Sequence, residues 1–266
     1  MPEGPEVLNF YLFIKPLLDD KIIEKLQIIS GKYTRKGIPN IEKVKNISII
    51  DILIKGKSIF IKCDNDISLV FVHGMTGCYS KEKEKHSRIE FNFKDDKSKL
   101  YYNDTRNFGT LTIYTTENDF KKAWDYLGPD ILNTEVTFEN FYSRLNKYPN
   151  MKIGIALLEQ KLLSGIGNYL RCDILWYCKI HHERRVGTLT NEEKEKLYDA
   201  AINIIKYHAN REHNLKYVPK NEFFVYQQSK DIFNNKVHRI EFNSRTVHYV
   251  DWEDDDDEII IIKRNN

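Results

Sequence analysis

The chain has 266 residues, with 41 basic and 39 acidic side chains, and 41% of it is hydrophobic. This composition excludes a disordered or fibrous chain, and the length allows about two domains of ~150 residues. No apolar run approaches the ~18 residues of a membrane helix, and the N-terminus lacks a secretory signal pattern. We therefore expect an intracellular protein, cytoplasmic or nuclear, that is not secreted.

The charge is distributed unevenly along the chain. Seven of the 39 acids lie within residues 251–258, which contain no Lys or Arg. The rest of the chain carries 41 basic side chains against 32 acids, an excess of +9. Such an excess can attract a polyanion, and a run of like charges is typical of a solvated tail. We predict an acidic tail over residues 251–266.

The first predicted element is a helix that begins near residue 5, because apolar residues from Val7 to Leu18 recur at helical spacing. Pro16 is predicted to help end this helix. Residues 21–115 then change to short β-rich runs separated by Gly, Asn and Asp, which is typical of an antiparallel sandwich or barrel. These runs are Ile47–Ile54, Ser58–Lys62, Ser68–Val72, Arg88–Phe93 and Gly109–Tyr114.

The second half of the chain is predicted to form helices followed by a hairpin. Gly128-Pro129 marks a linker, and Thr190 to Glu193 fits a capping box that opens a helix running to about Tyr207. Two strand-like runs flank Asn243-Ser244 as a hairpin would. The fold class is therefore α+β. The predicted domains are a helix plus β-sandwich (1–125), a linker (126–135), a helical domain (136–220) and a β-hairpin (221–250).

The four cysteines are Cys63, Cys78, Cys172 and Cys178. They form no CxxC pair and none follows Cys178, which excludes a zinc site built from thiolates in the C-terminal segment. We expect reduced and mostly buried thiols.

Pro2 is a candidate nucleophile. After removal of Met1 it would carry a secondary amine with a reference pKa near ~8, and the positive end of the following helix would lower that pKa further. Attack on an aldehyde-like carbon would give an iminium, which is a strong electron sink. Glu3 lies next to it and could protonate a sugar ring oxygen or relay protons.

The string from Met1 to Glu6 is one of six motifs that follow one another along the chain. In this order, they make the chain resemble the formamidopyrimidine-DNA glycosylase/endonuclease VIII family over nearly its whole length. The other motifs are Ile54-Lys55-Gly56-Lys57, Gly74-Met75-Thr76-Gly77, Asp104 to Gly109, Leu127-Gly128-Pro129, and the helix–two-turn–helix from Leu158 to Leu170.

The resemblance implies a role for each matching residue. Lys57 would be a third catalytic residue that points into the lesion site, where it binds phosphate or helps proton transfer. Asn168 and Arg245 would hold phosphates, and the glycine-rich turn before Asn168 would offer free backbone N–H groups to a phosphate. Extrusion of a base leaves a void in the duplex, and the side chains implied to fill it are those of Met75, Arg106 and Phe108.

The C-terminal hairpin resembles the DNA-binding finger of the family, with one departure. Many members hold this finger with four cysteines on zinc, whereas the segment Phe224–Val250 contains none. This is similar to the endonuclease VIII-like members with a zincless finger, with Arg245 at the tip. Two smaller departures are Glu159 where Asp is common and Asp173 where Glu is common.

The resemblance implies a bifunctional DNA glycosylase and abasic-site lyase that needs no metal or organic cofactor. Its partner would be damaged or abasic DNA, duplex or single-stranded, and it would act as a monomer. Only about fifteen residues, Arg211 to Val225, fill the interval that covers the lesion in purine-specific relatives, which favours oxidised pyrimidines. Gln227 and Gln228 are candidates to touch the lesion. The alternatives are an oxidised-purine glycosylase and a damaged-DNA-binding protein without catalysis.

Overall fold

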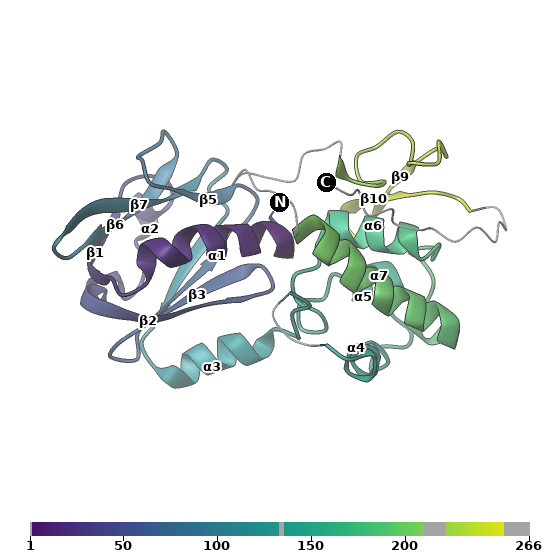
Figure 1. Cartoon of the computed structure of the whole chain (residues 1–266), viewed down its shortest axis with the longest axis horizontal. Coiled ribbons are helices and arrows are strands. Elements are labelled where there is room, and N and C mark those ends of the chain that lie inside the picture. The colour runs from purple at the N-terminus through teal and green to yellow at the C-terminus, as the bar shows by residue number, and fades with distance from the viewer. Residues whose placement is uncertain (1, 133–135, 210–221, 253–266) are drawn as a thin grey trace.

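The computed structural model describes residues 2–132, 136–209 and 222–252 (Figure 1). An antiparallel β-body in the first half of the chain stands beside a helical body formed by the second half. The helices are α1 (Gly4–Leu18), α2 (Tyr33–Lys36), α3 (Glu117–Tyr126), α4 (Phe138–Leu145), α5 (Ile153–Ala156), α6 (Asn168–Tyr177) and α7 (Asn191–Ala209). The strands are β1 (Ile22–Ile28), β2 (Lys45–Lys55), β3 (Ser58–Cys63), β4 (Ser68–Val72), β5 (Gly77–Ser80), β6 (Ser87–Phe93), β7 (Asp96–Asp104), β8 (Thr110–Tyr114), β9 (His238–Phe242) and β10 (Arg245–Tyr249).

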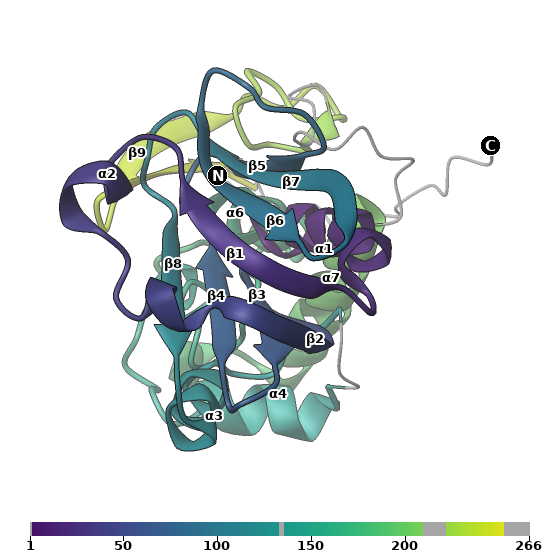
Figure 2. The same cartoon turned by 90° about the vertical axis from the view of Figure 1, so that its left-hand side faces the viewer.

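The first eight strands pair in the order β5-β7-β6-β1-β2-β3-β4-β8. Strand β2 belongs to both layers of the resulting sandwich (Figure 2). Its first residues pair with β1, and its residues from Ile49 to Lys55 pair with β3 with a break in register near Ile49. Such an irregularity bends a strand and increases its twist, which lets one strand continue from one layer into the next.

Helix α1 packs on the sandwich through one apolar stripe. Val7, Phe10, Ile14 and Leu18 are at most 1% exposed and belong to the sandwich core. The N-terminus of α1 points out of the β-body toward α7 and the helical body (Figure 1). The first residues of the chain therefore lie where the two bodies meet.

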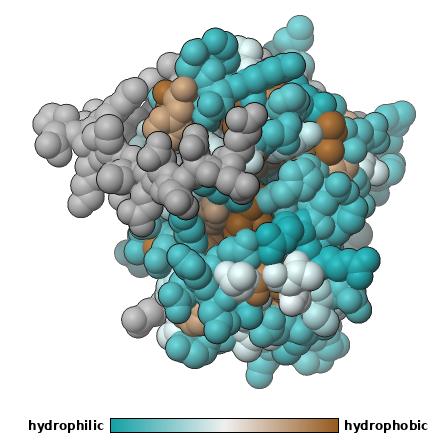
Figure 3. Space-filling model, turned by 90° about the vertical axis from the view of Figure 1, so that its right-hand side faces the viewer, coloured by the Kyte–Doolittle hydropathy of each residue, from teal (hydrophilic) through white to brown (hydrophobic). Residues whose placement is uncertain are grey.

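The hairpin β9–β10 packs against the helical body rather than standing alone. Its turn residues Asn243 and Ser244 both have positive φ, as a type I′ turn requires. The helical core includes side chains from the C-terminal segment, namely Phe224, Val225, Val237, Phe242, Val247 and Val250. The end of the molecule that carries α7 is mainly hydrophilic outside, with apolar side chains visible in the middle of this face (Figure 3).

The predicted α+β class is confirmed, and all five predicted strands are present within one or two residues of their expected bounds. The strands β1, β5 and β7 were not predicted, because their charged or very short sequences lack a clean alternation. Helix α1 ends at Leu18, the last residue of the predicted apolar spacing and two residues beyond Pro16, which was expected to help end it. A proline there removes the donor for the carbonyl of Leu12, whose side chain is 55% exposed, so water can reach this turn.

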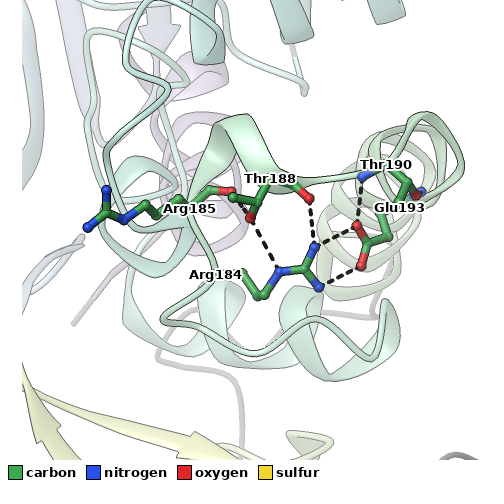
Figure 4. A network of polar contacts seen from close by, with 5 residues as sticks. All are labelled: Arg184, Arg185, Thr188, Thr190 and Glu193. Atoms are coloured by element: carbon green, nitrogen blue, oxygen red, sulfur yellow. Dashed lines mark hydrogen bonds and ion pairs between the residues drawn. The ribbon is translucent and has the colours of Figure 1, made fainter.

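The capping box that opens α7 is confirmed. The backbone N–H of Glu193 donates to Thr190 Oγ1 at 3.1 Å, and the Thr190 N–H donates to Glu193 Oε2 at 2.8 Å. Arg184 adds two bonds to the same carboxylate, at 2.9 and 3.0 Å, which ties the preceding loop to the helix (Figure 4). Among the described residues, no helix has both the length and the apolar character to span a bilayer.

Candidate active site

The site is built where the start of α1 meets the turn that precedes α6. Pro2 is buried, and the N–H of Gly4 donates to the Gly165 carbonyl at 2.9 Å. Gly165 has φ +99°, a conformation that favours glycine, and its own N–H donates to Gln160 Oε1 at 3.2 Å. Two segments about 160 residues apart in sequence are thereby joined backbone to backbone.

The carboxylate of Glu3 caps helix α6. It accepts the backbone N–H groups of Gly167, Tyr169 and Leu170 at 2.8, 3.0 and 3.2 Å, and the Glu3 side chain is only 1% exposed. These groups are among the donors that a helix leaves unpaired at its N-terminus. The expectation of free N–H groups for a phosphate is therefore wrong for Gly165 and Gly167, whose N–H groups donate to Gln160 and Glu3.

The electrostatics of Glu3 and Lys57 are linked. Burial raises the pKa of Glu3 to about 7, and the positive charge of Lys57 opposes this rise. Burial lowers the pKa of Lys57 to about 8, with the carboxyl of Glu3 opposing and the charge of Arg245 adding to the decrease. An acid and a base whose pKa values lie close to neutrality can exchange protons with a reacting group at working pH.

A second carboxyl group, that of Glu6, holds the backbone of Glu3 in position. Glu6 Oε2 accepts the backbone N–H of Glu3 at 2.9 Å and the hydroxyl of Tyr169 at 3.0 Å. Burial raises the pKa of Glu6, and burial together with the two glutamates raises that of Tyr169. The motif includes Glu6, but sequence reasoning assigned it no role, and it missed Tyr169 altogether.

Lys57 lies in the tight β2–β3 turn, where it is half-buried. The N–H of Gly56 donates to Asp130 Oδ2 at 2.7 Å, so the linker between the bodies holds this turn. Gly56 has φ +61°, and a Cβ at this residue would lie 2.7 Å from Ser164 Cβ. Sequence reasoning gave no role to Asp130, although it directly follows the Gly-Pro breaker that marked the linker.

Asn168 and Arg245 meet across the interface between α6 and the hairpin. Asn168 Nδ2 donates to the Thr246 carbonyl at 2.9 Å, and the buried Arg171 guanidinium donates to Asn168 Oδ1. Arg245 is exposed at the hairpin turn, and its charge acts on both Lys57 and Arg171. The structure thus gathers Pro2, Glu3, Lys57, Asn168 and Arg245 in one neighbourhood.

The three residues expected to fill a void in DNA lie on two loops that touch. Thr76 joins the loops, because its Oγ1 accepts the N–H of Arg106 at 2.8 Å and its hydroxyl donates to Asp104. Met75 is half-buried, and Phe108 is 54% exposed with the Arg106 guanidinium 4.9 Å from its ring centroid. Pairing of Ser58 with Val72 sets the Met75 loop beside the turn of Lys57.

Gln227 and Gln228 are the two residues that the sequence analysis named as candidates to touch the lesion. Gln227 is exposed with φ +61°, and the carbonyl of Gln228 accepts a bond from Arg239 at 3.0 Å. The described residues contain one His/Glu group close enough to share a cation, His181, His182 and Glu183. Its Glu183 is paired with Lys152.

Replacement of Gly167 by alanine is expected to disturb the position of Glu3. The added Cβ would lie 2.2 Å from Glu3 Cδ, so the carboxyl group must move. We expect the single-turnover rate of the reaction at this site to fall by about 100-fold with little change in substrate affinity. The control is Gly187→Ala, which also meets a neighbour but far from Glu3. Single-turnover rates equal to wild type for Gly167→Ala would contradict this account.

Comparison with known proteins agrees with this geometry. Residues 1–111 match the formamidopyrimidine-DNA glycosylase N-terminal domain, and residues 127–215 match the formamidopyrimidine-DNA glycosylase H2TH domain. A formamidopyrimidine-DNA glycosylase of Ligilactobacillus salivarius is 33% identical over 213 residues, 77% of this chain and 75% of the relative. One of Bacillus cereus is 31% identical over 211 residues, 76% and 75% of the two chains.

Solved structures give the same fold. The Lactococcus lactis Fpg bound to abasic-site DNA has a TM-score of 0.79 at 24% identity, over 93% of this chain and 97% of the other. The MutM (Fpg) protein of Thermus thermophilus gives 0.79 at 23%, with the same coverage. The fold and the matches define a DNA-repair glycosylase. The chain belongs to the formamidopyrimidine-DNA glycosylase family.

Proposed function

We propose that this protein is a bifunctional glycosylase and abasic-site lyase that uses Pro2 as its nucleophile. The observation that carries the proposal is the junction of α1 and α6, where Pro2 and Glu3 are buried beside Lys57. A terminal amine next to an acid of raised pKa suits attack on a sugar carbon. This catalytic role requires removal of Met1.

The reaction would proceed through an iminium. The Pro2 nitrogen bonds to the sugar C1′ as the bond between C1′ and the base breaks. The base leaves with that electron pair and takes up the proton that the Pro2 nitrogen loses, so the nitrogen regains a lone pair. Glu3 protonates the ring oxygen, and the ring opens to the iminium. Loss of a C2′ proton then expels the 3′ phosphate by β-elimination, and a second proton loss expels the 5′ phosphate by δ-elimination. Hydrolysis of the remaining iminium frees Pro2.

DNA would bind across the face that these residues share. Lys57 and Arg245 would hold phosphates around the lesion, since charged donors bind phosphate oxygens strongly. Asn168 would add the second N–H of its neutral amide, whose Nδ2 also donates to the Thr246 carbonyl. Met75, Arg106 and Phe108 would enter the stack left open by the extruded nucleotide. Phe108 supports this role because its ring is more than half exposed with a guanidinium over it, unlike a core phenylalanine. We propose a monomer that acts on DNA inside the cell.

For the damaged base we propose an oxidised pyrimidine, as in the endonuclease VIII-like members with a zincless finger. The support is the short interval Arg211 to Val225, of which residues 211–221 lie outside the described part. The Ligilactobacillus salivarius relative is named for formamidopyrimidine, whereas one Lactococcus lactis Fpg structure holds DNA with an oxidised pyrimidine. Both classes of lesion therefore belong in the test.

The experiment presents single lesions in otherwise identical duplexes and traps the iminium with borohydride. We expect faster adduct formation on thymine glycol and dihydrothymine than on 8-oxoguanine or formamidopyrimidine. A purine preference would favour the oxidised-purine alternative. No adduct with preformed abasic DNA, despite binding, would favour a damaged-DNA-binding protein without catalysis.

A further inference from the structure

The hairpin finger contains a buried carboxylate at its base. Asp231 is 7% exposed and lies before β9, in a segment without cysteine. Its Oδ1 accepts the N–H groups of Phe233 and Asn235 at 3.0 and 2.8 Å. Its Oδ2 accepts Asn235 Nδ2 at 3.1 Å and the indole Nε1–H of Trp176 at 3.0 Å. One side chain therefore closes the loop 231–235 and ties it to α6.

Trp176 lies on α6 and contacts this loop, while Asp173 of the same helix accepts backbone N–H groups of the preceding residues 224–226. The Trp176 ring lies 5.1 Å from that of Phe224, stacked at 12°, and 6.1 Å from that of Phe233. A third ring, Trp252, lies 6.4 Å away beyond the end of β10. Trp176 itself is 2% exposed. It thus contacts the segment before the hairpin and the segment after it.

The base is linked to the rest of the finger by backbone bonds. The Val237 N–H donates to the Ser229 carbonyl at 3.0 Å, and Arg239 Nη2 donates to the Gln228 carbonyl at 3.0 Å. From there β9 pairs with β10 in continuous register up to Phe242 opposite Arg245. An isolated two-stranded hairpin is marginal in water, so its attachments decide where its tip lies.

We propose that Asp231 and Trp176 are positioning residues that anchor this finger on α6, as a cross-link would. Their hydrogen bond fixes the base of the hairpin on α6, the helix whose N-terminus is capped by Glu3. The tip with Arg245 is thereby held beside Lys57. The consequence for DNA binding rests on the phosphate contact of Arg245 in the proposed function.

The test uses two conservative variants of the full chain. Trp176→Phe keeps an aromatic ring but loses the N–H donor, and Asp231→Asn keeps the size but loses one acceptor. We expect the amide hydrogens of β9 and β10 to exchange about tenfold faster, as for a lost hydrogen bond of ~1.4 kcal/mol. Affinity for a duplex with a tetrahydrofuran abasic analogue should fall about tenfold, and the single-turnover rate at saturating DNA should change less than about twofold.

The charge change in Asp231→Asn lets the test separate an effect of geometry from an effect of charge. Asp231→Asn removes a negative charge, which by itself would strengthen binding to DNA. The matched control is Glu241→Gln on the exposed side of β9, which removes the same charge and should bind equally well or better. Weaker binding by Asp231→Asn alone therefore reports geometry rather than charge.

A double variant separates positioning from general loss of stability. In an Arg245→Ala background, Trp176→Phe should weaken binding by less than about twofold, because the contact that it positions is already gone. An equal loss in both backgrounds, or unchanged exchange of the hairpin amides, would overturn the inference. If Arg245→Ala alone binds like wild type, the phosphate contact in the proposed function is wrong, and faster hairpin exchange would still support the anchor.

Discussion

Acetylation of the Pro2 nitrogen is expected to abolish the borohydride-trapped adduct with abasic-site DNA and to slow strand cleavage by at least about 1000-fold. An acetylated nitrogen has no lone pair available for attack, so no iminium can form. Pro2 is buried just before α1, and the following residues are held by the bonds of Gly4 and Glu3 to the turn before α6. The effect therefore isolates the chemistry from the fold.

Retention of Met1 would block the Pro2 nitrogen in the same way as acetylation. In preparations with different fractions of retained Met1, measured by intact mass, the amount of adduct should follow the fraction with free Pro2. DNA affinity should change far less, because Lys57, Asn168 and Arg245 remain. Full lyase activity of acetylated protein would contradict the assignment of Pro2.

Replacement of Glu3 by Gln is expected to slow base excision by about 10²- to 10⁴-fold, the usual contribution of a general acid. The amide cannot protonate the ring oxygen, and one of the three backbone donors of α6 loses an oxygen acceptor. Cleavage of a preformed abasic site should fall less, because the Pro2 nitrogen is intact. Tyr169→Phe, which removes only the bond to Glu6, should cost no more than about tenfold.

The pH dependence follows from the two shifted groups. The pKa of Glu3 is raised to about 7, so the protonated acid is abundant below this pH and is lost as pH rises through it. The rate of base excision should fall above about pH 7 in wild type and lose this slope in Glu3→Gln. The pKa of Lys57 is lowered to about 8, so its charge is lost above that pH and KM should rise. A Lys57→Arg variant should not show this rise. A flat profile in wild type would contradict the role of Glu3.

The local signals in the sequence were sufficient for most elements. The short β-rich run Ser68–Val72, the Thr190–Glu193 box and the Asn243-Ser244 turn each specify their structure over a few residues, and each is present. The catalytic candidates come from chemistry and motif order, and their roles stay predictions. A terminal imino nitrogen beside an acid is an uncommon pairing, and it can be seen in the sequence without knowledge of the surrounding fold.

Sequence reasoning failed where one residue bonds to distant partners. The turn from Gly165 to Asn168 suggests an open phosphate site, because its free N–H groups are a local property. Only tertiary structure brings Glu3 onto those groups from the other end of the chain. The hydrogen bonds of Glu6, Asp130 and Asp231 also arise only from tertiary structure, since each carboxylate bonds to groups from distant segments.

The sequence by itself determined the class of fold, the lack of thiolate ligands in the finger and the candidates for the chemistry. Tertiary structure alone decided which backbone donors are occupied, how burial shifts the pKa values of Glu3 and Lys57, and how the finger is anchored on α6. The physical reason is that periodicity and turn chemistry act over a few residues. Burial and hydrogen-bond pairing depend on every segment that packs around a group.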